Sequence, residues 1–115
     1  MAWYIPKEER KAMRLRAAQR RLTRQKRRNE MKIERQEKIA DLIRYEFGIP
    51  IESVTPDKHL IMDFNADSLD MVELIMSIEE SLKVEISDEE LQTLSTVQDI
   101  YDIVEKKVAE KEGGA

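Results

Sequence analysis

The stretch DFNADSLDMVELIMSIEESL, residues 63–82, decides the fold of this chain. From Ser68 onward, apolar residues recur every three or four positions, and this spacing places them on one face of an α-helix. The residues on that face are Leu74, Ile78 and Leu82, with Met71 or Ile75. We therefore predict an amphipathic helix over residues 68–82, and a serine between two aspartates stands at its start.

A second helix is predicted upstream, over about residues 33–47. Its expected buried face consists of Ile33, Ile39, Leu42, Ile43 and Phe47. Gly48 is suited to a left-handed cap, and Pro50 prevents the helix from continuing. From Lys7 onward the upstream residues are strong helix formers without glycine or proline, so the helix can run on from them without a break.

Two more helices are expected downstream. Ser87 is followed three positions later by Glu90, a capping-box pattern that predicts a short helix over about 88–93. Thr96 can cap a last helix, whose inward residues are Ile100, Ile103, Val104 and Val108. The bundle interior predicted from all these patterns is Leu74, Ile78, Leu82, Ile86, Leu91, Leu94, Ile100 and Val104.

Residues 48–66 form a long connection with two prolines and no sustained periodicity. The apolar residues expected to pin it to a core are Ile51, Val54, Leu60, Ile61 and Phe64. No strand is predicted. The fold class is therefore all-α: a four-helix bundle of three longer helices and one short helix, with a long loop between the first two and a basic helical extension before them.

Composition excludes several classes of site. The 115 residues suffice for one domain and include no cysteine, so disulfides and thiolate metal sites are excluded. The single histidine, His59, is interpreted as a solvated loop residue, and no metal site is predicted. No apolar run approaches the length of a membrane span and no signal peptide is visible, so a soluble, cytoplasmic protein is expected.

Ser68 lacks the surroundings of a catalytic nucleophile. Only His59 and nearby carboxylates are candidate bases, no third group orients them, and a GxSxG turn is absent. One interpretation of Ser68 is a simple helix cap. Another follows from the free N–H groups and dipole at a helix N-terminus, which favour a bound phosphate.

The segment DFNADSLDMVELIMSIEESLKVEISDEE resembles the acyl carrier protein family of dissociated fatty-acid synthesis, with likeness extending over about residues 33–107. The residues that match the family motif are Asp67, Ser68 and Leu69, with Ala66, Asp70, Val72, Glu73 and Leu74. The later EISDEE and STVQDI fit the family's short third helix and the start of its fourth. The chain departs at Asn65, usually glycine, and at Phe64, usually leucine; asparagine tolerates the left-handed backbone that glycine adopts.

The resemblance implies a carrier rather than an enzyme. Ser68 would be the attachment site of 4'-phosphopantetheine, transferred from coenzyme A by a separate phosphopantetheinyl transferase, with Asp67 at the transferase interface. This would explain the missing base, and it would make the chain a phosphoprotein. Acyl chains would be carried as thioesters on the arm, for fatty-acid or related lipid biosynthesis. In the family, the interior of the bundle opens to enclose them.

The predicted helix 68–82 carries an acidic face made of Asp67, Asp70, Glu73, Glu79 and Glu80. It is either a solvated surface or a docking surface for acyl-processing enzymes with basic patches. Leu69, Val72 and Met76 would form the apolar centre of that surface, although Val72 and Met76 fit the core equally well.

Residues 1–30 differ in charge from the rest. They hold eleven Lys/Arg and three acids, a net charge of +8, whereas the remainder carries −12. We divide the chain into a basic, helical extension (1–30), an acyl carrier domain (31–110) and a flexible tail (111–115). For the extension four interpretations stay open: a solvated helix, a contact for nucleic acid or a ribonucleoprotein, a membrane-surface anchor using Trp3, Tyr4 and Ile5, and docking onto an acidic carrier domain. The alternative function is a small helical interaction protein that keeps the carrier fold and binds nucleic acid through the extension.

Overall fold

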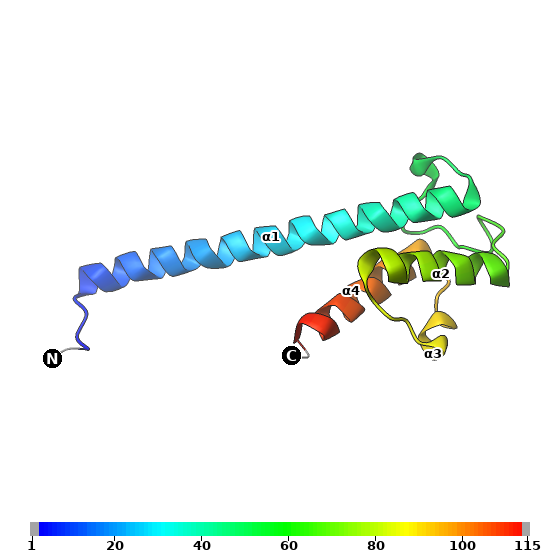
Figure 1. Cartoon of the computed structure of the whole chain (residues 1–115). Coiled ribbons are helices and arrows are strands. Elements are labelled where there is room, and N and C mark those ends of the chain that lie inside the picture. Colours follow the sequence, from blue (N-terminus) through cyan, green and yellow to red (C-terminus); the bar gives the residue numbers. More distant parts are fainter. Residues whose placement is uncertain (1–2, 114–115) are drawn as a thin grey trace. The chain divides into compact units, whose positions relative to one another are not determined.

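The computed structural model describes residues 3–113, and within this range it contains helices and no named strand. The elements are α1 (Lys7–Phe47), the 3-10 helix η1 (Ile51–Ser53), α2 (Ser68–Leu82), α3 (Asp88–Leu91) and α4 (Val97–Gly113), shown in Figure 1. The predicted all-α class, with a long loop between the first two helices of the bundle, is confirmed. Within the described range, none of the helices has both the length and the apolar character needed to cross a membrane.

The chain divides into two compact units. Unit 1 ends at Ile33 and unit 2 begins at Glu34. In unit 1 the apolar residues Met13, Leu15 and Leu22 are exposed, so this part of α1 has no core of its own. Ile33 is 53 % exposed, and its predicted place on a buried face is therefore wrong.

Unit 2 begins with the last part of α1. Ile39 and Ile43 are fully buried, and Leu42 and Phe47 pack against the same cluster, as the periodicity predicted. Gly48 has a φ of +63°, the left-handed conformation of a helix cap, and the Ile49 N–H donates to the Arg44 carbonyl at 3.2 Å. The predicted end of this helix is therefore confirmed.

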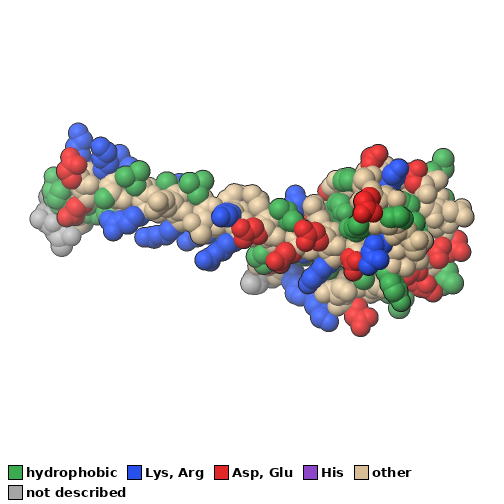
Figure 2. All heavy atoms as spheres, turned by 90° about the horizontal axis from the view of Figure 1, so that it is seen from above, with side chains coloured by type: hydrophobic (Ala, Val, Ile, Leu, Met, Phe, Trp, Pro, Cys, Tyr) green, Lys and Arg blue, Asp and Glu red, His purple; other side chains and the backbone are tan. Residues whose placement is uncertain are grey.

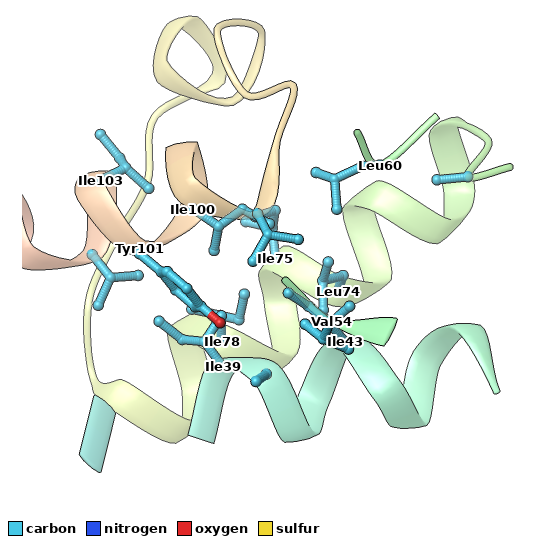
Figure 3. Packing of buried hydrophobic residues seen from close by; sticks show 14 residues of the cluster. Ile39, Ile43, Val54, Leu60, Leu74, Ile75, Ile78, Ile100, Tyr101 and Ile103 are labelled. Atoms are coloured by element: carbon cyan, nitrogen blue, oxygen red, sulfur yellow. The ribbon is translucent and has the colours of Figure 1, made fainter. Parts of the chain in front are cut away.

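One hydrophobic core joins α1, α2, α4 and the long loop (Figure 3). The largest side chains with no exposed surface are Ile39, Ile43, Leu60, Leu74, Ile78, Val97, Ile100 and Val104. Ile75 is also buried, whereas the other residues predicted to be interior, Leu82, Ile86, Leu91 and Leu94, are partly buried and pack against the cluster. Because packing of the apolar faces supplies most helical stability in proteins, this cluster holds unit 2 together.

The long loop is held mainly by its backbone. The Leu60 N–H donates to the Ser95 carbonyl at 2.9 Å, and the Val97 N–H donates to the Lys58 carbonyl at 3.0 Å. Val54 and Leu60 are buried and Phe64 packs against the core, as predicted. Ile51 and Ile61 are exposed instead, so their predicted pinning role is wrong.

His59 is a partly exposed loop residue that takes part in the loop's internal structure. Its Nδ1 accepts the N–H groups of Ile61 at 3.2 Å and Met62 at 3.1 Å. Its own N–H donates to the Asp63 carboxylate at 2.7 Å, and it forms a bridge with Thr96. The prediction that His59 lies in a loop is confirmed, and its partly exposed ring also caps a turn.

Both predicted caps of the last two helices are present. Ser87 and Glu90 form a capping box at α3, and Thr96 and Asp99 exchange side-chain and backbone bonds at the start of α4. α3 ends at Leu91, two residues earlier than expected. α4 continues to Gly113, so residues 111–113, assigned from sequence to a flexible tail, are helical; residues 114 and 115 of that tail lie outside the described residues.

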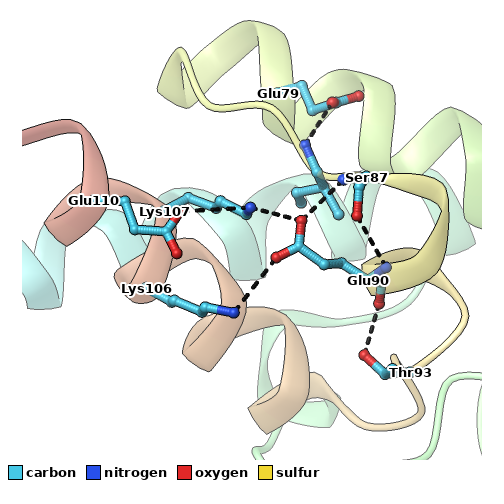
Figure 4. A network of polar contacts seen from close by, with 8 residues as sticks. Glu79, Ser87, Glu90, Thr93, Lys106, Lys107 and Glu110 are labelled. Atoms are coloured by element: carbon cyan, nitrogen blue, oxygen red, sulfur yellow. Dashed lines mark hydrogen bonds and ion pairs between the residues drawn. The ribbon is translucent and has the colours of Figure 1, made fainter. Parts of the chain in front are cut away.

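Glu90 also links α3 to α4 (Figure 4). Its carboxylate accepts from Lys107 Nζ at 2.6 Å, and this hydrogen bond, with the backbone N–H of Ser87, lowers the pKa of Glu90 to about 2. A carboxyl with a lowered pKa in the folded state stabilises the fold above its unfolded value of 4.5 and loses that contribution as the pH falls toward 2.

We therefore expect the free energy of unfolding to fall between about pH 4.5 and pH 2 more steeply in the parent than in Glu90→Gln. Urea unfolding of both proteins at several pH values measures this difference. If the free energy of unfolding changed with pH equally steeply in both proteins across that range, the Glu90–Lys107 pair would contribute nothing to the pH dependence.

Candidate functional site

The start of α2 is shaped by three residues of the preceding turn. Asn65 has a φ of +57°, the left-handed conformation expected of an asparagine at this place, and its N–H donates to the Ile61 carbonyl at 2.9 Å. Ala66 is buried, and its N–H donates to the Leu60 carbonyl at 3.1 Å. Asp67 then takes the extended conformation of a helix cap.

Asp67, not Ser68, is the cap of α2. The Asp67 Oδ1 accepts the Asp70 N–H at 2.8 Å, and the Asp70 Oδ2 accepts the Asp67 N–H at 3.0 Å. This reciprocal capping box satisfies two backbone donors that the helix leaves free. The interpretation of Ser68 as a simple cap is therefore wrong.

Ser68 is the first residue of α2, and its side chain is exposed. Within residues 3–113, its hydroxyl has no hydrogen-bond partner and the N–H groups of Ser68 and Leu69 have no acceptor. Among the described residues no base activates the hydroxyl, because none is hydrogen-bonded to it, and the one histidine uses Nδ1 to cap a turn. The geometry thus presents an unactivated hydroxyl beside two free donors at the positive end of a helix.

An apolar groove of about 450 Å³ adjoins this hydroxyl. It is lined by Ser68 and Asp67 at one side and by apolar residues, namely Ile61, Ala66, Met71, Val72, Leu91 and Leu94. Aliphatic and Met side chains adapt readily to a flexible ligand. A chain attached at Ser68 therefore has an apolar surface beside it, between α2 and the α3 region.

The residues predicted to dock partners differ in their availability. Leu69, Val72 and Met76 are 64 %, 42 % and 61 % exposed, which places Val72 and Met76 on the surface rather than in the core. Glu73 and Glu80 are also exposed. Asp70 belongs to the capping box, and Glu79 accepts the Ile86 N–H at 3.0 Å, so these two carboxylates already have structural partners.

A residue that the sequence pattern did not single out joins the acidic face. Oxygen atoms of Glu46, at the end of α1, Asp70 and Glu73 lie within 4.8 Å of one another. A hydrogen bond with Glu73 raises the pKa of Glu46, and repulsion from Glu73 and Asp70 adds to it. Exposed carboxylates can hold a hard cation, but they often gather without one; here their crowding favours contact with a basic group.

The sequence did not predict that the residues lining the groove come together. Leu91 and Leu94 were expected to be interior and Ile61 to pin the loop, yet all three line the groove beside Ser68. Periodicity reports only which residues share a face of one helix. It carries no signal for a surface assembled from a loop, α2 and the residues around α3.

Removing the Asp67 side chain should test the capping box. We expect Asp67→Ala to lower the free energy of unfolding by about 1 kcal/mol, because Asp70 and its neighbours lose a bonded cap. Asp63→Ala is not a neutral control, since Asp63 accepts from His59. Asp88→Ala in α3 is a closer match, because Asp88 is exposed and follows its cap. Equal urea midpoints for parent and Asp67→Ala would contradict the capping role.

Comparison with known proteins gives a consistent result. Residues 37–104 match the family described as phosphopantetheine attachment site. The chain is 45 % identical over 74 residues to the acyl carrier protein of Syntrophobacter fumaroxidans, covering 64 % of this chain and 91 % of that protein. It is 47 % identical over 73 residues to the acyl carrier protein of Thermosynechococcus vestitus, covering 64 % and 90 %.

Solved structures agree with these relatives. The acyl carrier protein from Enterococcus faecalis superposes with a TM-score of 0.59 at 30 % identity, over 66 % of this chain and 96 % of that chain. The family match lies wholly within unit 2 and contains Ser68. The similarity therefore covers the helical bundle and its exposed serine.

Proposed function

The chain belongs to the acyl carrier protein family, and from this membership we propose that Ser68 is the residue that carries 4'-phosphopantetheine. Members of this family are carriers, not enzymes, and the arm is their covalently attached cofactor. When bound, the arm supplies a terminal thiol that holds acyl groups as thioesters. The observation that carries the proposal is the exposed Ser68 hydroxyl at the start of α2, which has no hydrogen-bond partner within residues 3–113.

The residues around Ser68 fit a phosphodiester. The N–H groups of Ser68 and Leu69 have no acceptor within residues 3–113, and the positive end of the α2 dipole favours a negative group there. The capping box holds the Asp67 and Asp70 carboxylates against backbone donors. Asp67 directly precedes Ser68 in the chain, and we propose that it contacts the transferase.

The apolar groove suits the cargo. Its lining by Met71, Val72, Leu91 and Leu94 offers aliphatic surface next to Ser68. Burying an apolar chain there removes hydrocarbon from water, which lowers the free energy by about 25 cal/mol for each Å² buried. We propose that acyl groups of fatty-acid or related lipid biosynthesis lie along this surface.

The docking surface that we propose consists of Leu69, Asp70, Val72, Glu73, Met76, Glu79 and Glu80 on α2. Exposed Leu69, Val72 and Met76 provide its apolar centre. Glu73 and Glu80 are exposed, and Glu73 is crowded by Glu46, so a basic patch on a partner enzyme would relieve repulsion. Such contacts give fast, salt-sensitive encounters, as a carrier that visits several enzymes requires.

Reversing two of these charges should slow modification. We expect Glu73→Lys/Glu80→Lys to lower kcat/KM of a phosphopantetheinyl transferase about tenfold at low salt, because steering toward a basic patch is lost. The control is Glu37→Lys/Glu89→Lys, which makes the same change of charge at exposed sites on α1 and α3. Equal rates for the two variants would rule out a docking role for Glu73 and Glu80.

Three finer statements stay predictions. We propose residues 31–110 as the carrier domain, preceded by the basic extension of residues 1–30 and followed by a short tail. The family match at 37–104 and the unit boundary at Ile33 support a carrier domain that begins near Met31. The fatty-acid type of cargo and the cytoplasmic location rest on the sequence alone.

The absence of cysteine provides a direct test of the carrier function. The full chain is incubated with coenzyme A and a phosphopantetheinyl transferase, free coenzyme A is removed, and thiols are titrated. We expect one thiol per chain after the reaction and none before it. No thiol gained, under conditions in which an acyl carrier protein in a parallel reaction gains one, would overturn the proposed function.

A further inference from the structure

The basic part of unit 1 is a helix whose charges are unneutralised. Residues 7–28 hold eleven Lys/Arg and only two acids, Glu8 and Glu9. All eleven cations are exposed, and none forms an ion pair with any residue in the range 3–113. Figure 2 shows Lys and Arg side chains, in blue, along this part of the chain. Such a concentration of positive charge creates a field that attracts polyanions.

The arginines form two rows along this helix. With about 100° between successive residues, one row consists of Arg10, Arg14, Arg21 and Arg28. The other row consists of Arg16, Arg20 and Arg27, about 120° away around the axis. Met13, Ala17 and Arg24 lie between the rows. The helix therefore presents two parallel rows of guanidinium groups, and the narrow strip between them carries one more, that of Arg24.

The surface beside the second row is hollowed. Arg16, Arg20, Arg24 and Arg27, with Gln19 and Thr23, line an open depression of about 470 Å³. Four guanidinium groups border the same space with no carboxylate among its lining residues. Guanidinium groups are planar donors that bind phosphate oxygens in pairs, so this surface suits a row of phosphates.

We propose that this basic helix binds double-stranded DNA by lying in the major groove, with one arginine row facing each phosphate strand. An α-helix with its side chains is about 10–12 Å wide, and the major groove is about 12 Å wide. Twenty-two helical residues span about 33 Å, and the two rows place arginines along this length. The contacts are with phosphates, so binding does not depend on base sequence.

Other polyanions fit this helix less well. Leu15 and Leu22 face away from the rows, but Lys11 and Lys26 share that side, so it offers little apolar surface to a membrane. The major groove of duplex RNA is deep and narrow, so it does not admit a helix of this width. The acidic helix α2 of a second copy has 15 residues and spans about 22 Å, which is too short to pair with both rows along their length.

The test measures binding of the full chain to a labelled DNA duplex of about two turns by fluorescence anisotropy. About six phosphate contacts predict that affinity falls roughly a thousandfold or more between about 50 and 200 mM salt. Arg20→Gln/Arg27→Gln removes two charges from one row, whereas Lys11→Gln/Lys26→Gln removes two charges from the opposite side. We expect the first variant to bind at least about tenfold more weakly than the second.

Circular dichroism of both variants establishes that the helix is retained before their affinities are compared. Matched duplex RNA, vesicles of anionic lipid and the protein's own self-association are measured in the same buffer. Tighter binding to RNA or vesicles than to DNA, salt-sensitive self-association without DNA binding, equal weakening by the two variants, or no DNA binding at about 50 mM salt would each overturn the proposal. Thiol gain after the transferase reaction reports the carrier role separately.

Discussion

Ser68→Ala will gain no phosphopantetheine and no thiol under conditions in which the parent chain gains one of each. The reason is chemical, because alanine has no oxygen to form the phosphodiester. The fold should be unaffected, since the Ser68 side chain is exposed and has no bonded partner within residues 3–113. Intact mass before and after incubation with coenzyme A and the transferase measures the effect.

Ser77→Ala is the matched control for this loss. Ser77 lies on the same helix, but its hydroxyl donates to the Glu73 carbonyl at 3.0 Å and is thereby occupied. We expect Ser77→Ala to be modified as completely as the parent. Loss of modification in Ser77→Ala but not in Ser68→Ala would mean that the arm is attached to Ser77 and not to Ser68.

Ile78→Ala will lower the free energy of unfolding more than any other substitution proposed for this chain. Ile78 has no exposed surface and lies in the core shared by α1, α2 and α4 (Figure 3). Removing three buried carbons leaves a cavity, and such substitutions cost about 2–5 kcal/mol. Since a domain of this size is stable by roughly 5–10 kcal/mol, the change removes a large part of the total.

The control for Ile78→Ala is Met76→Ala, two residues earlier on α2. Met76 is 61 % exposed, and we expect its truncation to change the free energy of unfolding by less than about 0.5 kcal/mol. Urea unfolding with unchanged slope measures both values. Equal midpoints for the two variants would contradict the assignment of Ile78 to the core and Met76 to the surface.

Much of the bundle could be predicted because its signals are local. The periodicity around Leu74 and Ile78 defines α2, Gly48 ends α1, and the Ser87–Glu90 pattern starts α3. Asn65 takes the left-handed conformation expected from its small polar side chain. Each of these features depends on residues no more than a few positions apart, so one sequence is enough to recognise it.

Contacts between distant residues could not be predicted in the same way. Arg35 and Glu105 are joined by two hydrogen bonds of 2.7 Å across 70 positions, and this pairing raises the pKa of Arg35. Glu46 meets Glu73 only because α1 and α2 are packed together. The backbone bonds that hold the long loop leave no side-chain pattern at all.

At the candidate site, the family motif points to Ser68 as the attachment residue, and this stays a prediction. A serine next to an aspartate at a helix start does not tell which of the two is the cap. The structure assigns the cap to Asp67 and leaves the Ser68 hydroxyl unbonded within the described range. Ile33 was predicted to be buried but is exposed, because an apolar residue at helical spacing is buried only where another element covers it.

Mapping the modified residue tests most directly whether Ser68 bears the arm. The full chain is loaded with phosphopantetheine, digested, and the modified peptide is fragmented by tandem mass spectrometry. The chain offers six serines, namely Ser53, Ser68, Ser77, Ser81, Ser87 and Ser95. We expect the fragments to place the whole added mass on Ser68. Added mass on any other serine, or none on the protein, would contradict attachment at Ser68.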